Sequence, residues 1–295
     1  MPALLICTDG SAYAPSLYRH SAWAAERLAG TVEVLHVFPP APPFLVPPVN
    51  FMGDPGMGSG TLALPELTAL NAAQEKEARD GAMELLETAA AALKEAGVQD
   101  VELTALPGRL PDVLGLWEKP VDLLVMGKRG ESTAAQQGAL GSQLETVIRQ
   151  SRSPVLVVSH NFRPIKRFLI SFDDSPAAHA ALREVVGSPL LKGLSCELMM
   201  AGDPTDENRA ALDSARAFLK TGGFDAQEFL MQGDPETVSA WEIAAHHIDL
   251  LVMGAYSHSR FLQFFIGSTT SEMIRNCRVP VLVMGGRMRS ADETP

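Results

Sequence analysis

Apolar and polar positions along the chain alternate in blocks that predict strands and helices in regular succession. Short apolar runs at residues 3–8 and 168–172 each end in an acidic, hydroxyl-bearing stretch, Asp9-Gly10-Ser11 and Asp173-Asp174-Ser175. Such a run predicts a buried strand, and the Ser or Asp after it predicts the N-cap of a helix. Further helices are predicted at about 14–28 and 177–186, with a long helix later in each half, and further strands at 32–38, 101–106, 196–201 and 226–231.

One longer block occurs twice, at residues 121–159 and 248–285. Each copy contains an apolar strand, a small-residue turn, a loop, Gly-Ser, a helix and a closing strand headed by Pro-Val. Because strands alternate with helices in both halves, the pattern predicts an α/β protein with two tandem, doubly wound parallel-sheet domains of the flavodoxin/Rossmann-like type. We place the domains at 1–160 and 166–288, joined by a short polar linker around 160–166.

The first copy carries an insertion that the second lacks. Most of the extra residues lie at about 39–65, a stretch dense in Pro and Gly. Loops of this length are usually functional or mobile. The segment is either a disordered excursion or a lid or partner-contacting arm. Its apolar residues, Phe44 and Phe51 among them, are costly to leave in water and favour the second interpretation.

Composition narrows the class of protein. The chain has 295 residues and a formal net charge of −11, which argues against nucleic acid or an anionic membrane as the main partner. It contains no apolar run of 18 residues, and its N-terminus lacks a basic region before the apolar run, so we expect a cytoplasmic protein. Cys7, Cys196 and Cys277 are scattered without CxxC spacing, which predicts reduced core thiols.

Three kinds of residue are expected to converge at the carboxyl ends of the strands, where open α/β sheets bind ligands. They are the acid after the first strand, a Gly-containing turn after the fourth strand, and Gly-Ser at the start of the next helix. Glycines and a helix N-terminus expose N–H groups that suit phosphate, and Lys128 and Arg129 add positive charge. The acid cannot favour phosphate, but it can accept from an adenine amino group or a ribose hydroxyl. A tight turn with a Gly-Ser cap is the structural alternative. Neither a Walker A loop nor GxGxxG after a first strand occurs.

With these motifs the chain resembles the universal stress proteins of the tandem type, over almost its entire length. The family motif is G-x2-G-x9-G-[S/T], on an adenine nucleotide alpha hydrolase-like fold. The resemblance implies adenine-side contacts from Asp9 and Val37, and phosphate and ribose contacts from the motif glycines and serines, with the same roles in the second half. The candidate nucleotide-binding residues, motif neighbours included, are Asp9, Val37, Met126, Gly127, Arg129, Gly130, Gly141, Ser142, Gln143, Asp173, Ala201, Met253, Gly254, Tyr256, Ser257, Gly267, Ser268 and Thr269.

Neither half matches the motif fully. Ten residues separate Gly130 from Gly141 where the family has nine, and Ser257 replaces the second glycine in the other half. Val37 corresponds to the smaller Ala201. The duplication predicts two pockets, and these departures predict that they are not equivalent.

The resemblance implies a stress-response protein that binds ATP or AMP, with or without Mg²⁺, as a sensor or regulator. No dedicated enzyme is expected, because no residue is evident as a catalytic base; a slow ATPase is one alternative, and a nucleotide-free scaffold with decayed motifs is the other. In the family the last strand pairs across a dimer. Here the strands at 153–159 and 279–285 can pair within one chain, which leaves a further homodimer open.

His246 and His247 precede a predicted strand at the end of a predicted helix. No third metal ligand lies near them in sequence, so we predict that they serve as a helix cap or solvent contact and not as metal ligands.

Overall fold

The structure is a computed structural model that describes residues 3–40, 64–128, 143–255 and 268–284. The insertion predicted at 39–65 falls almost wholly outside them. The elements of the first half are β1 (Ala3–Cys7), α1 (Ala14–Leu28), β2 (Thr31–Phe38), α2 (Leu64–Glu95), β3 (Val101–Pro107), α3 (Leu110–Gly115), β4 (Leu123–Gly127), α4 (Leu144–Gln150) and β5 (Val155–Val158).

The second half repeats this order after a connection at residues 159–166 that forms neither helix nor strand. The domain bounds 1–160 and 166–288 stay predictions. The elements of the second half are β6 (Arg167–Ser171), α5 (Pro176–Gly187), the 3₁₀ turn η2 (Pro189–Leu191), β7 (Ser195–Ala201), α6 (Asp206–Thr221), β8 (Gln227–Met231), α7 (Pro235–Ala245), β9 (Leu250–Gly254), α8 (Ser268–Asn276) and β10 (Val281–Met284).

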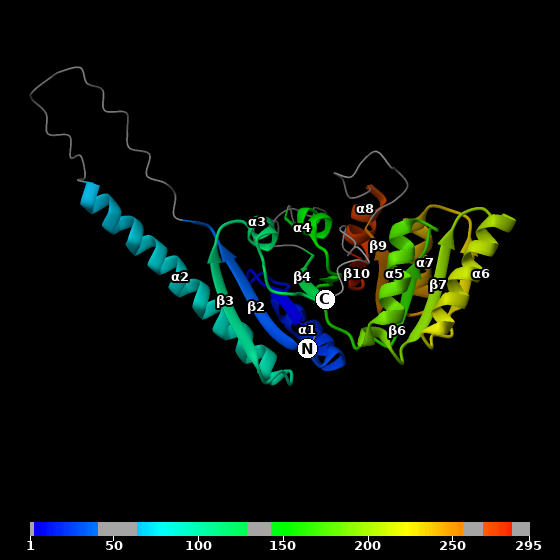
Figure 1. Ribbon diagram of the computed structural model, residues 1–295, viewed down its shortest axis with the longest axis horizontal. Coiled ribbons are helices and arrows are strands. Elements are labelled where there is room, and N and C mark those ends of the chain that lie inside the picture. The colour runs from blue at the N-terminus through cyan, green and yellow to red at the C-terminus, as the bar shows by residue number, and fades with distance from the viewer. Residues whose placement is uncertain (1–2, 41–63, 129–142, 256–267, 285–295) are drawn as a thin grey trace, which may run out of the picture.

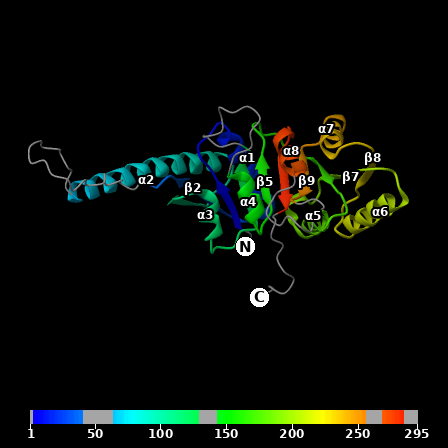
Figure 2. The ribbon, with the colours of Figure 1, turned by 90° about the horizontal axis from the view of Figure 1, so that it is seen from above.

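All described strands join one ten-stranded sheet in the order β3-β2-β1-β4-β5-β10-β9-β6-β7-β8. Within each half the strands are parallel, with the order 3-2-1-4-5 of a doubly wound sheet, as the sequence predicted. The halves meet where β5 and β10 pair antiparallel, with Val157 opposite Val281 and Val155 opposite Val283. The predicted pairing of the two closing strands within one chain is therefore confirmed (Figures 1 and 2).

Helices cover both faces of this sheet. Alternate residues of β1 belong to opposite cores: Leu4 and Ile6 pack under α1 and α2, while Leu5 and Cys7 pack toward α3 and α4. In the second half α5 and α6 cover the first face, and α7 and α8 the second. This explains why central strands such as β4 and β9 are continuous apolar runs, since both of their faces are covered.

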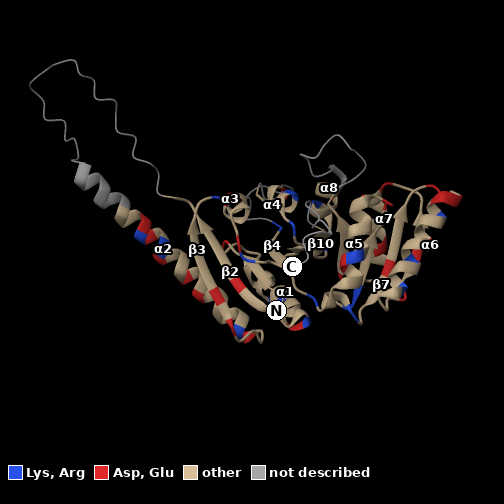
Figure 3. Ribbon diagram, in the orientation of Figure 1, with Lys and Arg blue, Asp and Glu red and all other residues tan. Residues whose placement is uncertain are grey.

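The two halves differ most in their second helix. α2 has 32 residues, twice the 16 of α6. Its C-terminal part is anchored in the core through Leu86, Ala89 and Leu93, whereas residues 72–80 are almost all exposed. Figures 1 and 2 show the N-terminal part of α2 projecting beyond the sheet, and Figure 3 shows acidic and basic residues interspersed along it.

Of the two helix caps predicted after the first strand of each half, only the one in the second half is present. Ser175 Oγ accepts from the Ala178 N–H at 3.1 Å and caps α5, as predicted. α1 begins two residues later relative to the repeat, with Tyr13 in the N-cap position and no side-chain cap. The predicted cap at Ser11 is therefore wrong: the Ser11 carbonyl instead accepts from the Ala14 N–H at 2.9 Å in a turn that precedes the helix.

All three cysteines are free thiols, as predicted. Cys7 and Cys196 are buried, and burial raises the pKa of both, that of Cys196 to about 12. Burial also raises the pKa of Cys277. Thiols held in the neutral form are poor nucleophiles, so a core-packing role is indicated.

Candidate functional site

The register of the strands aligns the predicted site residues at the carboxyl edge of each half. Cys7 is level with Leu35 and Met126, so Asp9, Val37 and Gly127 follow at adjacent strand ends. The second half repeats this arrangement, with Ser171 level with Met199 and Met253 and followed by Asp173, Ala201 and Gly254. Because parallel strands end at the same edge, both sets lie where such sheets bind ligands.

Both acids are held in the same turn. Asp9 Oδ1 accepts from the Ser11 N–H at 3.0 Å, and Asp173 Oδ1 accepts from the Ser175 N–H at 3.1 Å. Each is an Asx turn, in which the side chain bonds the backbone two residues on. Both residues are half-buried. The turn therefore holds each carboxylate in place just beyond the carboxyl end of its strand, in the absence of a ligand.

The residue after each acid has left-handed backbone, with φ of 72° at Gly10 and 57° at Asp174. A Cβ at Gly10 would lie 2.8 Å from Leu85 Cδ1 of α2, the end of a flexible side chain, so it is chiefly the left-handed backbone that favours glycine here. Asp174 instead extends into solvent and accepts from His179 Nε2 at 2.9 Å. The second edge thus carries an additional acid that the first lacks.

Gly254 has a packing role that the sequence did not predict. A Cβ there would lie 2.7 Å from the carbonyl carbon of Ala177 and 2.8 Å from its Cβ. Only glycine lets the first turn of α5 lie against the end of β9. Gly127 occupies the corresponding last position of β4.

Lys128 does not supply the positive charge that was predicted for the first pocket. Its side chain is buried, and Nζ donates to the carbonyl of Cys277 and, at 3.4 Å, to that of Arg275. Both carbonyls lie at the carboxyl end of α8, where a cation is favoured by the helix dipole. The predicted role for Lys128 is wrong, because its ammonium group joins the first half to the second.

The apolar candidates form walls on one face of the sheet. Met126 and Met253 are buried, while Val37 and Ala201 are half-buried and pack with the core under α3, α4, α7 and α8. Gln143 precedes α4, and its Oε1 accepts from the Leu110 N–H at 3.1 Å, at the start of α3. Its amide oxygen therefore has a structural partner.

The remaining candidates belong to the two sequence motifs. Ser268 and Thr269 form the first turn of α8. Seven candidates fall outside the described residues: Arg129, Gly130, Gly141, Ser142, Tyr256, Ser257 and Gly267.

Sequence reasoning missed a polar network beside Asp9. The hydroxyls of Thr8 and Tyr18 are hydrogen-bonded at 3.0 Å, and His36 Nδ1 donates to the Thr8 carbonyl at 2.8 Å. Burial raises the pKa of Tyr18, so the phenol stays neutral. At the position of Thr8 the second half has Phe172, whose ring packs against His179. The presence of Thr8 in one copy and Phe172 in the other was the sequence signal that could have revealed this network.

Comparison with known proteins gives the family. The model of the universal stress protein family matches residues 1–159 and 197–285. A universal stress protein from Synechocystis sp. is 34% identical over 96% of this chain and 99% of its own length. A universal stress protein from Archaeoglobus fulgidus has the same fold over 99% of this chain and 97% of its own, with 20% identity and a TM-score of 0.68.

A putative universal stress protein from Pseudomonas aeruginosa aligns over 96% of this chain and 93% of its own, with 14% identity and a TM-score of 0.58. None of the described helices is long and apolar enough to cross a membrane. The two matched segments fall on the two halves of the sheet, and the relatives are matched along nearly their whole lengths. The chain belongs to the universal stress protein family, as the doubled motif predicted.

Proposed function

We propose that this protein binds an adenine nucleotide, ATP or AMP, at the carboxyl edge of each half and acts as a cytoplasmic sensor or regulator. The observation that carries the proposal is the recurrence of one arrangement in both halves. In each, an acid held in an Asx turn, a small apolar residue and the glycine that begins the motif stand at the ends of three neighbouring strands.

The roles follow from the chemistry of each group. A carboxylate held at 9 or 173 accepts from an adenine amino group or a ribose hydroxyl. Val37 and Ala201 provide the apolar contact for a base. The loops that open at Gly127 and Gly254 and lead into α4 and α8 supply N–H groups and helix N-termini for phosphate. Mg²⁺ would neutralise part of a triphosphate in the first pocket, because Lys128 is committed elsewhere.

The two pockets are expected to differ in affinity. The second has the smaller wall, Ala201, and the additional carboxylate of Asp174 near its mouth. An exposed negative charge disfavours a polyphosphate more than a monophosphate. We therefore expect the second pocket to discriminate more strongly against ATP relative to AMP.

Calorimetry with ATP, ADP and AMP, with and without Mg²⁺, tests the proposal on the full chain. Asp9→Asn and Asp173→Asn should each remove one of two binding events. Asp122→Asn is the matched control, because Asp122 Oδ2 accepts from the Ala3 N–H at 2.7 Å at the amino ends of β1 and β4, away from the carboxyl edge. No heat and no thermal shift at millimolar nucleotide would contradict the proposal.

A nucleotide-free scaffold is the rival, and a specific observation favours it: Asp9, Asp173 and Gly254 all have roles in the fold itself. Mass spectrometry of gently purified protein separates the two. Co-purified adenine nucleotide supports binding, and its absence together with silent calorimetry supports the scaffold.

A further inference from the structure

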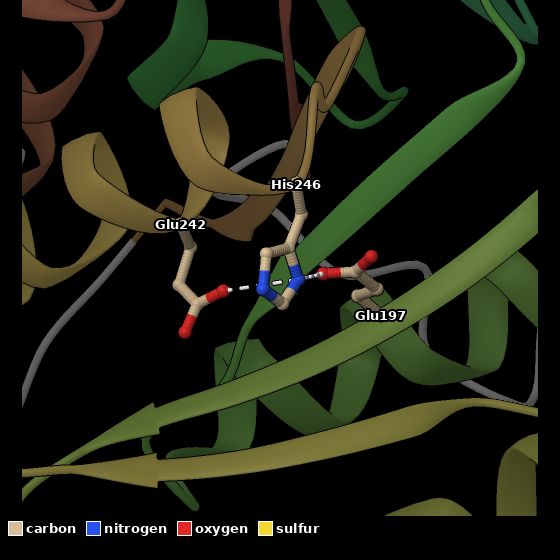
Figure 4. Close-up of side chains that lie close together, drawn as sticks. All are labelled: Glu197, Glu242 and His246. Carbon is tan, nitrogen blue, oxygen red and sulfur yellow. Dashed lines mark hydrogen bonds and ion pairs between the residues drawn. The ribbon is translucent and has the colours of Figure 1, made fainter.

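Three side chains from distant parts of the second half converge beneath α7 (Figure 4). Glu197 lies in β7, Glu242 lies in α7, and His246 is the C-cap residue of α7. His246 Nδ1 is 2.8 Å from Glu197 Oε2 and 3.4 Å from Glu242 Oε2. One ligand atom from each residue lies within 4.8 Å of the other two. This Glu197–Glu242–His246 cluster was not predicted, since 45 residues separate its first two members.

Glu242 is the unusual member of the cluster. It is 0% exposed, and neither of its carboxylate oxygens has a hydrogen-bond partner among the described residues. The carboxylate points toward the imidazole of His246 (Figure 4). A buried carboxylate without hydrogen bonds is costly unless a cation compensates it.

The first half shows how the same position is satisfied without a metal. Glu33 corresponds to Glu197, because each lies beside the central residue of its half's first strand. Lys119 corresponds to His246, four residues before the next strand, and its Nζ is 2.9 Å from Glu33 Oε2. The Thr104 hydroxyl donates to the other Glu33 oxygen at 2.6 Å. Glu33 thus has a permanent cation and a hydrogen bond.

The second half has one more carboxylate at this place, and among the described residues the ion pairs of both carboxylates are with His246. Gly115, at the end of α3, corresponds to Glu242, so the second half has gained a carboxylate. At the same time histidine stands where lysine does. Two carboxylates and one titratable imidazole make a donor set that lacks a fixed cation.

We propose that Glu197, Glu242 and His246 bind one divalent transition-metal ion, with Zn²⁺ the ion that the donor set favours. Imidazole nitrogen with carboxylate oxygen suits Zn²⁺, whereas Mg²⁺ and Ca²⁺ prefer oxygen alone. Tetrahedral Zn²⁺ with bonds of about 2.0–2.1 Å separates its ligand atoms by about 3.3 Å. The 3.4 Å between Nδ1 and Glu242 matches this spacing. The 2.8 Å pair with Glu197 must open by about 0.5 Å as the metal replaces the shared proton.

The surroundings already orient these ligands. The His246 ring makes an edge contact with Phe229, with centroids 4.9 Å apart, and Arg167 donates to the His246 carbonyl at 3.1 Å. Glu242 and His246 are spaced i,i+4, so they project from one side of α7. The His246 side chain is 27% exposed, which leaves an entry path and a fourth position for water.

This metal site is independent of the proposed nucleotide sites. Glu197 and His246 lie toward the amino ends of β7 and β9, while Ala201 and Gly254 lie at their carboxyl ends. Failure of one proposal therefore leaves the other standing.

The test is calorimetric titration of metal-free, tag-free full-length protein with ZnCl₂ near neutral pH. Co²⁺ absorption serves as a second readout, since tetrahedral Co²⁺ has intense visible bands. We expect one tight Zn²⁺ per chain. Glu242→Gln should weaken Zn²⁺ binding at least about tenfold. His246→Lys should abolish it, because the ammonium group takes the place that Lys119 holds in the first half.

Two features keep the test interpretable. His247→Ala, an exposed neighbour of the cluster, is the matched control and should bind Zn²⁺ as the wild type does. Both test variants should fold, as thermal unfolding without metal will show: Glu242→Gln removes a buried charge, and His246→Lys recreates a pairing that the first half already uses. If wild-type protein shows no saturable Zn²⁺ binding, or if either variant binds Zn²⁺ like wild type, the proposal is overturned.

Discussion

The two halves place a carboxylate at the same point of the sheet and satisfy it by different means. Glu33 is held by the Lys119 ammonium group and the Thr104 hydroxyl, whereas Glu197 shares His246 with the buried Glu242. The residues that contact the carboxylate differ between the halves, while the position of the carboxylate on its strand is the same. Backbone pairing constrains where a strand residue lies. The residues at the helix ends around it can be substituted without disturbing that pairing.

The carboxyl edges show the same division. Both retain the acid in its Asx turn, but the residue before it is hydrogen-bonded Thr8 in one half and apolar Phe172 in the other. The two copies have thus kept the acid and its turn at each carboxyl edge, while the residue before the acid has changed.

The largest effect is expected at the contact that joins the halves. Lys128→Ala should lower the free energy of unfolding by about 3 kcal/mol, because it removes a buried cation and leaves two carbonyls at the end of α8 without their donor. Urea denaturation measures this. Lys220→Ala is the control, since Lys220 lies in the last turn of α6 and is exposed. A loss under about 0.5 kcal/mol for Lys128→Ala would show that the halves are held together without this contact.

A smaller, pH-dependent effect should belong to the first half alone. His20 of α1 is fully buried against Phe162, where α5 has half-buried Glu184. Burial lowers the pKa of His20 to about 4, although Nδ1 donates to the Ser16 carbonyl; Arg19 lowers it further. Between pH 6.5 and 4 the unfolded chain therefore binds the proton more readily, and stability falls as pH falls.

At about pH 5 this should cost about 2 kcal/mol, and His20→Leu should remove that part of the pH dependence. Unfolding curves at several pH values, with exposed His247→Ala as the control, measure the difference. Identical pH profiles for His20→Leu and wild type would contradict the buried, neutral state of His20.

The smallest effect concerns helix starts. Ser175→Ala should cost about 1 kcal/mol, because α5 loses its N-cap. Ser11→Ala is the matched change in the first half, where Tyr13 and not Ser11 occupies the N-cap position of α1. Thermal unfolding of both variants should show the larger decrease for Ser175→Ala. Equal decreases would mean that the two helix starts are energetically alike.

Much of the fold could be predicted because its strands are apolar runs. Residues 32–38 and 101–106 were placed to within one residue, and the pairing of β5 with β10 followed from two short apolar strands at the ends of the repeats. The resemblance to the family implied that Asp9 and Val37 lie together, and the repeat extended this to Asp173 and Ala201; the strand register brings each pair to adjacent strand ends.

Side-chain direction could not be predicted in the same way. Lys128 follows a glycine at a strand end, where an ammonium group can serve a phosphate or a helix terminus equally well. Glu197 and His246 lie far apart in sequence and meet only because α7 packs on β7. The range predicted for α1, residues 14–28, is confirmed, but its cap was wrong because Ser11 resembles an N-cap while the turn that it opens continues to Tyr13.

The antiparallel pairing of the closing strands is not the only way in which the two halves depend on each other. Lys128 stands at the entrance to the first motif loop, while its ammonium group holds the far end of α8, the helix that follows the second motif loop. A ligand that displaces Lys128 must therefore work against α8. Any coupling carried by this contact would act equally in both directions, as thermodynamic linkage requires.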